Sequence, residues 1–359
     1  MPSALLLGCG GGLASPATPP SASSNPPSDL QAAALGAAAL QQTWYQTGSG
    51  DWNTDGWWNN ANSLTAIELY TQTSGSTQWT PVIGQVFTRN SGGGFLNNYY
   101  DDEGWWALAW IEAYDLTKNP TYLNTAASIF SDMTTGWDNV CGGGIWWSKA
   151  RTYKNAIANE LFLTVAARLA RRVPNASQQT ADLSWARQEW LWFSASGMIN
   201  AQNLINDGLT STCANNQKTT WTYNQGVILG GLVSLYRQTQ DNSLLSQAQS
   251  VAGAAIANLA GADGILHDPC EPNCGPDSEQ FKGIFTRNLA VLNAAAPLAG
   301  YASFLQNNAQ SIWDKDRASG NLFGQVWSGP LTPADAITQT SALDALIAAA
   351  AANPDANLN

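Results

Sequence analysis

The sequence predicts an all-α fold, an (α/α)6 barrel in which six inner helices are surrounded by six outer ones. Two observations predict it. Helical periodicity covers almost the whole chain after residue 28, while strand-like alternation is rare and no βαβ rhythm occurs. Helices that are apolar on every side also alternate with amphipathic helices, and a helix of the first kind must be buried on every side.

Twelve segments carry the helical pattern. They span approximately residues 29–45, 60–73, 78–90, 101–117, 120–134, 153–172, 178–200, 222–240, 243–260, 278–298, 301–316 and 335–351. The segment 178–200 is amphipathic, because Leu183, Ala186 and Trp190 recur every three or four residues. Residues 105–111 and 157–169 are apolar nearly all round, which assigns them to inner helices.

Each inner helix is preceded by, or begins with, a polar or aromatic cluster. One such cluster is an ordinary helix cap. Six clusters at the starts of the six inner helices indicate a shared binding surface, because parallel inner helices bring their starts to one end of the barrel. We expect a cleft at this end. The residues expected to contact a ligand there are Trp57, Asn62, Tyr100, Trp146, Asn155, Tyr223, Asn224, Gln225, Arg287 and Trp327.

The composition restricts the class of ligand. The chain has 359 residues, only 11% of them charged, and a net charge of −11. This acidity disfavours nucleic acid, anionic membranes and polyanionic substrates. The 17 Trp residues exceed the needs of a core, and flat aromatic faces stack on sugar rings. A neutral sugar polymer therefore fits the chain best.

Residues 1–28 have the composition of an export leader and a Pro/Ser-rich linker, with an apolar run at residues 5–7. The leader is atypical, since no Lys or Arg precedes the run. The sequence around Cys9 also resembles a lipid-attachment site. We expect a secreted or cell-surface protein without a transmembrane segment, in which residues 29–359 form one catalytic domain.

Four further cysteines suggest two disulfides in an exported protein. Cys270 and Cys274 lie in one short loop that can close on itself, so Cys141 would pair with Cys213 by elimination. Zinc binding is the weaker alternative, because the chain has a single His, His267, and no second close pair of cysteines. We expect neither a metal nor a cofactor.

Asp101 and Asp102 stand at the start of an otherwise apolar helix. Acidic residues are favoured in a first helical turn, but a buried carboxylate needs a partner or a purpose. Two adjacent carboxylates repel, so one should hold its proton to higher pH than the other, as an acid and a nucleophile require. Neighbours on a helix can place their carboxyl groups roughly 5–6 Å apart, which favours a retaining glycosidase over an inverting one.

Several runs resemble glycoside hydrolase family 76, the endo-α-1,6-mannanases. They are residues 99–110, which contain the Asp-Asp pair, and residues 141–147, 153–160, 222–226, 281–285 and 338–344. The resemblance implies an (α/α)6 barrel and retaining cleavage of α-1,6-mannan. It also implies that Asp101 is the nucleophile and Asp102 the acid/base.

Two alternatives stay open at this point. The family includes transglycosylases of cell-wall mannan and GPI glycans, and this chain resembles them less. Its Asp-Asp pair is followed by Glu103-Gly104-Trp105-Trp106, and no hydrophobic anchor tail precedes Asn359. A non-catalytic mannan-binding protein on the same scaffold is the other. We expect a monomer whose partner is α-1,6-mannan or its oligosaccharides.

Overall fold

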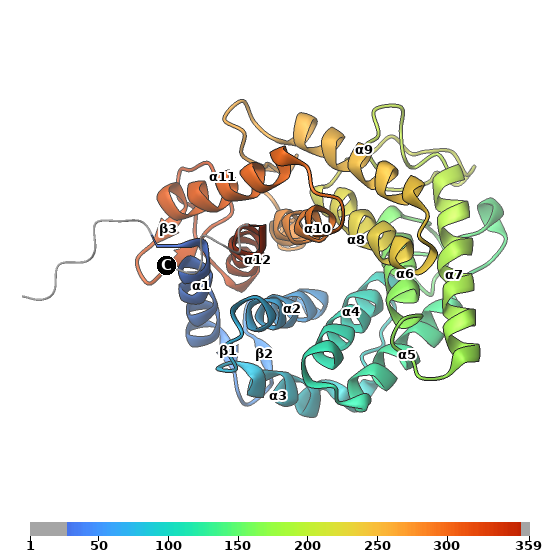
Figure 1. Cartoon of the computed structure of the whole chain (residues 1–359), viewed down its shortest axis with the longest axis horizontal. Coiled ribbons are helices and arrows are strands. Elements are labelled where there is room, and N and C mark those ends of the chain that lie inside the picture. Colours follow the sequence, from blue (N-terminus) through green and yellow to red (C-terminus); the bar gives the residue numbers. More distant parts are fainter. Residues whose placement is uncertain (1–26, 353–359) are drawn as a thin grey trace, which may run out of the picture.

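The computed structural model describes residues 27–352, and within them twelve α-helices form two concentric rings (Figure 1). The inner helices are α2 (Trp57–Ser74), α4 (Tyr100–Thr117), α6 (Ala156–Leu169), α8 (Thr222–Thr239), α10 (Phe281–Ala295) and α12 (Ala336–Ala352). The outer helices are α1 (Asp29–Thr43), α3 (Thr80–Asn90), α5 (Pro120–Thr134), α7 (Ala176–Ala195), α9 (Asn242–Leu259) and α11 (Ala299–Lys315). The predicted all-α barrel is confirmed. The predicted leader and linker, residues 1–28, lies almost entirely outside the described residues, and Cys9 lies outside them as well.

Short strands occur only as two antiparallel hairpins among these residues. They pair β1 (Tyr45–Gln46) with β2 (Asp51–Trp52), and β3 (Arg317–Ala318) with β4 (Leu322–Phe323). Three single turns of 3-10 helix cover Ser91–Gly93, Val140–Gly142 and Ser278–Gln280. None of the described helices is long and apolar enough to cross a membrane.

The inner ring is closed. Each inner helix packs against the next, and α12 packs against α2 to complete the circle. A hydrogen bond of 2.6 Å between the hydroxyls of Ser63 on α2 and Thr340 on α12 joins residues 277 positions apart. The alternation seen in the sequence follows from this arrangement: α12 is buried from Ala336 to Ala350, whereas α3 buries only Val82, Ile83 and Val86.

Glycines let inner helices approach closely. A Cβ on Gly226 of α8 would lie 2.6 Å from the Cα of Phe285 on α10, and a Cβ on Gly104 of α4 would lie 2.8 Å from the Cβ of Leu161 on α6. Both distances are too short for a real side chain. The glycines within these helices therefore serve interhelical packing.

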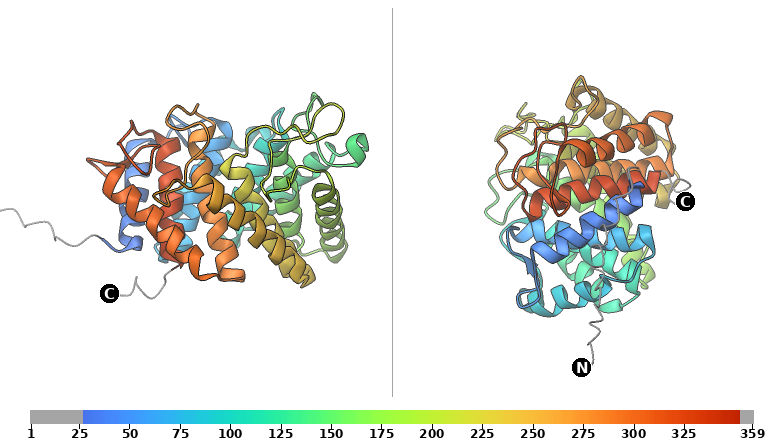
Figure 2. Two further views of the ribbon diagram at one scale, coloured as in Figure 1. Left: turned by 90° about the horizontal axis from the view of Figure 1, so that it is seen from above. Right: turned by 90° about the vertical axis from the view of Figure 1, so that its left-hand side faces the viewer.

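Local chemistry sets the helix ends. The predicted segment 153–172 begins as a helix only at Ala156, because the Asn155 side chain caps it by accepting the N–H of Ala158 at 3.4 Å. The predicted segment 278–298 starts with a 3-10 turn before α10. The long connections run from outer to inner helices, and Figure 2 shows the longer loops gathered on one side of the ring. This side holds the starts of the inner helices.

Candidate active site

Asp101 and Asp102 occupy the first turn of α4, and both are half-buried. The indole Nε1 of Trp147 donates to Oδ2 of Asp101 at 2.8 Å. The amide Nδ2 of Asn97 donates to Oδ2 of Asp102 at 2.6 Å. Each carboxyl is thus oriented by its own donor from a different loop, which gives the two groups distinct environments although they are adjacent in sequence.

The two carboxyls titrate as a pair. Burial raises the pKa of Asp101 to about 8, and the charge of Asp102 adds to the rise. Burial raises the pKa of Asp102 to about 6, while the Asn97 hydrogen bond lowers it. Between these values the pair holds one proton and one negative charge, the composition that an acid and a nucleophile need together.

Burial acts more strongly on Asp101, so its pKa is raised further above the ordinary value than that of Asp102. The resemblance implies that Asp102 is the acid/base, and this assignment of roles stays a prediction. The expectation that one carboxyl holds its proton to higher pH than the other is met.

A third carboxylate approaches the pair from the loop before α10. Asp277 is exposed and accepts a hydrogen bond of 3.0 Å from Nε1 of Trp58 at its Oδ1. Its charge raises the pKa of Asp102 and of Tyr223. Residues from the starts of α2, α4 and α8 and from the loop before α10 thus converge at one end of the barrel, as the sequence predicted.

Aromatic rings surround these carboxyls. Trp58 stacks on Trp105 with ring centroids 5.6 Å apart. Tyr223 stacks on Phe281 at 3.7 Å, with an interplanar angle of 9°. Tyr99, beside the pair, is 40% exposed. This combination of half-buried carboxyls and accessible rings suits a polyhydroxylated ligand with flat apolar faces.

The Gly-rich loop that carries Trp147 is held by a buried lysine. Lys154 donates from Nζ to Oδ1 of Asp138 at 2.9 Å and to the carbonyl oxygens of Val140, Gly143 and Gly144 at 2.8, 2.7 and 2.9 Å. The lysine is 2% exposed. Four acceptors on one ammonium group fix the loop in place.

The sequence profile described as glycosyl hydrolase family 76 matches residues 30–358. The chain belongs to this family. Among curated proteins, it is 30% identical over 218 residues to a mannan endo-1,6-alpha-mannosidase of Candida albicans, covering 55% of this chain and 47% of the relative. It is 27% identical over 278 residues to a mannan endo-1,6-alpha-mannosidase of Saccharomyces cerevisiae, covering 68% and 61%. The chain spans about half the length of the Candida relative.

Solved family 76 structures share the fold. The alpha-1,6-mannanase of Salegentibacter sp. HEL1_6 has a TM-score of 0.80 at 23% identity, over 90% of this chain and 99% of that one. An inactive variant of that mannanase, with two consecutive aspartates replaced by asparagine and alpha-1,6-mannotriose bound, has a TM-score of 0.79 at 22% identity, with the same coverage of both chains.

Three of the aromatic residues predicted to line the family 76 site are accessible. Trp57 is 37% exposed. Trp146 is half-buried, donates from Nε1 to Oδ2 of Asp138 at 2.7 Å, and lies over the Lys154 ammonium at 4.9 Å. Tyr223 is half-buried, and the charge of Asp101 is among the causes that raise its pKa. Tyr223 is the predicted residue most closely linked to the carboxyl pair.

Trp327 is fully buried, so the prediction that it lines a cleft is wrong. Its ring lies 4.3 Å from the ammonium of Lys282 inside the protein. Tyr100 is 2% exposed and its hydroxyl is 3.1 Å from that of Thr135. Asn155 is the buried cap of α6. These three side chains serve packing and capping, the ordinary roles of residues at helix starts.

Three of the remaining predicted contacts, Asn62, Asn224 and Gln225, are buried as well, and Arg287 is half-buried. Gln225 accepts the N–H of Ile205 at 2.8 Å and donates to its carbonyl at 2.9 Å. Asn62 accepts from Arg287 at 2.5 Å, and Arg287 also bonds Asp344 at 3.1 Å. Asn224 is fully buried. They do not form the accessible surface expected of them, because Gln225 bonds an adjacent loop and Asn62 and Arg287 bond each other between two inner helices.

The sequence does not identify Trp147, Asn97 or Asp277, which surround the pair. Trp147 lies in the run 141–147 that resembles family 76, next to the predicted Trp146. Asn97 and Asp277 stand in loops without periodicity, so no sequence pattern marks them. Glu103 is buried and binds both Lys149 Nζ, at 2.8 Å, and the N–H of Asn97, at 3.2 Å. The third acid of the run therefore anchors the loop that positions Asp102.

Both predicted disulfides are confirmed. Cys141 pairs with Cys213, and Cys270 pairs with Cys274. The first ties the loop held by Lys154 to the loop before α8. The second closes the loop that leads to Asp277.

Proposed function

We propose that this family 76 protein is an endo-acting hydrolase that cleaves α-1,6-mannosidic linkages with retention of configuration. The observation that carries the proposal is the Asp101–Asp102 pair, whose members accept hydrogen bonds from Trp147 and Asn97 respectively. The named activities of the relatives support the substrate. The inactive double-aspartate variant of the Salegentibacter mannanase supports the importance of such a pair.

Asp101 acts as the nucleophile in this proposal and Asp102 as the acid/base. Asp101 forms the bond to the anomeric carbon while Asp102 gives its proton to the leaving glycosidic oxygen; Asp102 then removes a proton from the water that releases the sugar. The reaction requires the pair's one proton to be on Asp102 and its negative charge to be on Asp101. Asp101 is then ionised when attack begins, with Trp147 holding its orientation.

The accessible rings next to the pair supply stacking surfaces for mannose units. Trp57, Tyr99 and Tyr223 are the residues we assign to this role, replacing the larger set expected from the sequence. We further propose that the protein works outside the cytoplasm, since its two disulfides suit an oxidising compartment.

The anomer of the first product tests the mechanism. Retention predicts that NMR of an α-1,6-mannan digest shows the α-anomer first, with the β-anomer appearing later by mutarotation. A β-anomer seen first would overturn the covalent intermediate and the role of Asp101. Mannan fragments joined to an added acceptor, without net release of reducing ends, would instead identify a transglycosylase. Binding without either product would identify a non-catalytic mannan-binding protein.

Asp277→Asn should move the pH profile. The Asp277 charge raises the pKa of Asp102, so its removal lowers this pKa and Asp102 loses its proton at lower pH. The step near pH 6 is that of Asp102, and the step near 8 is the loss of the pair's last proton, so the acidic limb of the kcat/KM profile should shift to lower pH. Asp314→Asn, which removes an equal charge on α11, should leave the profile unchanged. An unshifted limb in Asp277→Asn would show that this charge does not reach the pair.

A further inference from the structure

A cavity of about 440 Å³ lies at the other end of the barrel, between the C-terminal halves of the inner helices. Asp115, which lines it, stands 14 residues after Asp101 on the same helix, about 21 Å away at 1.5 Å per residue. The cavity is thus separate from the proposed active site. Its size falls within the range of small-molecule sites, roughly 300–1,000 Å³.

The inner end of this cavity is closed by a bonded group of side chains. Trp105 and Arg287 line it, with the guanidinium 5.7 Å from the centroid of the Trp105 ring. Arg287 is fixed by Asp344 at 3.1 Å and by Asn62 at 2.5 Å. Trp105 in turn stacks on Trp58, which donates a hydrogen bond to Asp277. These side chains lie between the cavity and the starts of the inner helices.

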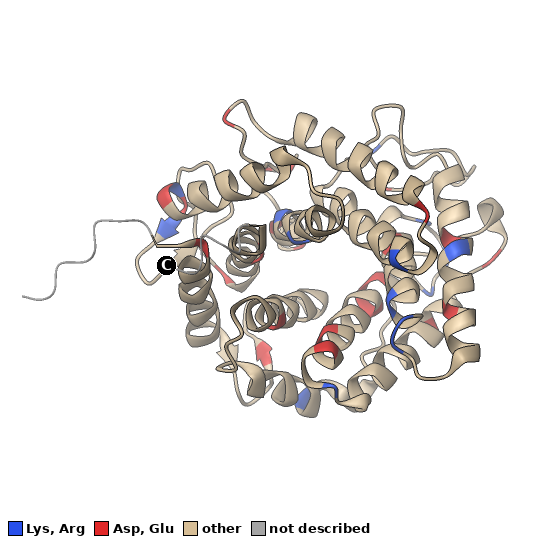
Figure 3. Ribbon diagram, in the orientation of Figure 1, with Lys and Arg blue, Asp and Glu red and all other residues tan. Residues whose placement is uncertain are grey.

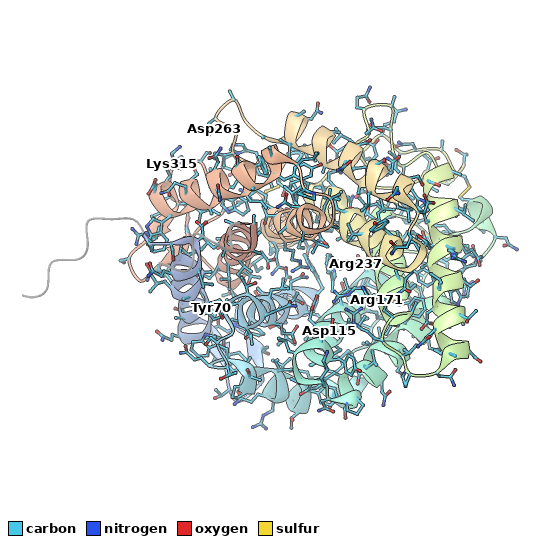
Figure 4. The ribbon with its side chains drawn as sticks, viewed as in Figure 1. Tyr70, Asp115, Arg171, Arg237, Asp263 and Lys315 are labelled. Atoms are coloured by element: carbon cyan, nitrogen blue, oxygen red, sulfur yellow. A yellow bond between two sulfur atoms is a disulfide. The ribbon has the colours of Figure 1, made fainter. Side chains whose placement is uncertain are left out.

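Four arginines line the outer part of the cavity: Arg168, Arg171, Arg172 and Arg237. They are four of only 15 Lys and Arg residues in a chain of net charge −11. Figure 3 shows basic positions on α6 and α8 near acidic positions on α4, and Figure 4 places Arg171, Arg237 and Asp115 around the centre of the ring. Such a concentration of positive charge is exceptional in this protein.

Two of these arginines are committed to ion pairs. Arg168 lies 2.7 Å from Oε1 of Glu112, and Arg172 donates from Nε to Asp115 at 2.8 and 3.0 Å. Arg171 and Arg237 are exposed, and neither forms an ion pair within residues 27–352. The four arginines therefore face two carboxylates, those of Glu112 and Asp115.

The excess positive charge affects the pKa of an arginine within the cluster. The pKa of Arg237 is lowered by burial and then by the charges of Arg171, Arg168 and Arg172. Glu68, enclosed beside the cluster, does not compensate at neutral pH, because burial raises its pKa well above the usual range and favours the neutral acid. Cations at helix C-termini are favoured by the helix dipole, which accounts for Arg168 and Arg237 in the last turns of α6 and α8. It does not account for the cavity between them.

The rest of the lining combines apolar side chains with neutral hydrogen-bonding groups. Hydroxyl and amide side chains are contributed by Thr65, Gln72, Thr73, Thr164, Ser234, Asn288 and Asn293. Hydroxyls and amides recognise hydroxyl-rich molecules, while guanidinium groups recognise phosphate. We propose that this cavity binds a sugar phosphate, with its phosphate between Arg171 and Arg237 and its ring directed inward toward the neutral polar groups.

Isothermal titration calorimetry of the whole chain at low salt tests the proposal with three probes: mannose 6-phosphate, inorganic phosphate and mannose. We expect mannose 6-phosphate to bind more tightly than inorganic phosphate. Mannose has no phosphate, so replacing Arg171 and Arg237 should not tighten its binding. The double variant R171Q/R237Q should weaken mannose 6-phosphate binding by at least tenfold. The control R89Q/R187Q removes two exposed arginines from α3 and α7 and should bind as the unmodified chain does.

The outcomes also separate this site from the proposed active site. Asp101→Asn should bind mannose 6-phosphate unchanged, and R171Q/R237Q should hydrolyse unphosphorylated mannan at the normal rate. Absence of binding, or binding unaffected by R171Q/R237Q, would overturn the proposal. Equal affinity for inorganic phosphate would overturn the assignment to a sugar phosphate. Loss of binding in Asp101→Asn would place the ligand at the carboxyl pair instead.

Discussion

Asp101→Asn should abolish the release of reducing ends from α-1,6-mannan, with a loss of kcat/KM of roughly 10⁴-fold or more, the scale of nucleophile removal in other enzymes. The amide cannot form the glycosyl ester, yet it can still accept the Trp147 hydrogen bond at its oxygen. The thermal unfolding midpoint should therefore not fall. A reducing-end assay and a melting curve on the same preparation give both values.

The companion variant Asp102→Ala separates the two roles. An acid is needed only when the leaving group is poor, so this variant should still be glycosylated by a mannoside with an activated aryl leaving group. Added azide should then release an α-mannosyl azide of retained configuration. Recovery of that product from Asp101→Ala instead of Asp102→Ala would exchange the roles of the two aspartates.

Lys154→Met should lower the free energy of unfolding by about 3 kcal/mol, since it removes the buried ammonium group that three carbonyl oxygens and the Asp138 carboxylate share. The loop that carries Trp147 would lose its anchor, so mannan hydrolysis should fall as well. Urea unfolding measures the first effect. Lys218→Met, at an exposed lysine, is the matched control and should change stability little. A loss below about 1 kcal/mol in Lys154→Met would show that the loop is held chiefly by other contacts, such as the Cys141–Cys213 disulfide.

The sequence predicted the ring of helices well, because burial on every side leaves a direct mark on composition. A segment such as α12 cannot be mistaken for a surface helix. The sequence also identified the Asp101–Asp102 pair, since two carboxylates at the start of a buried helix are costly unless they have a partner or a function. Both predictions depend on features local to one segment.

The surroundings of the pair were predicted poorly for a physical reason. Polar residues at inner-helix starts have two uses, contact with a ligand or hydrogen bonding to an adjacent loop, and the residue type is the same in both. Gln225 has the second use, Asn155 caps its own helix, and Trp327 is part of the core. The contacts of Trp147, Asn97 and Asp277 depend on how loops fold back over α4. These loops have no periodic sequence pattern that could predict their path.

The closure of the inner ring between α2 and α12 has a consequence for biosynthesis. A ribosome makes α2 near the beginning and α12 near the end, yet the two share an interface that includes the Ser63–Thr340 hydrogen bond. The apolar flank of α2 therefore stays uncovered until almost the whole chain has been made, and an incomplete chain has a gap in its ring. The complete barrel can therefore form only after α12 has been made, with the last helix closing the ring.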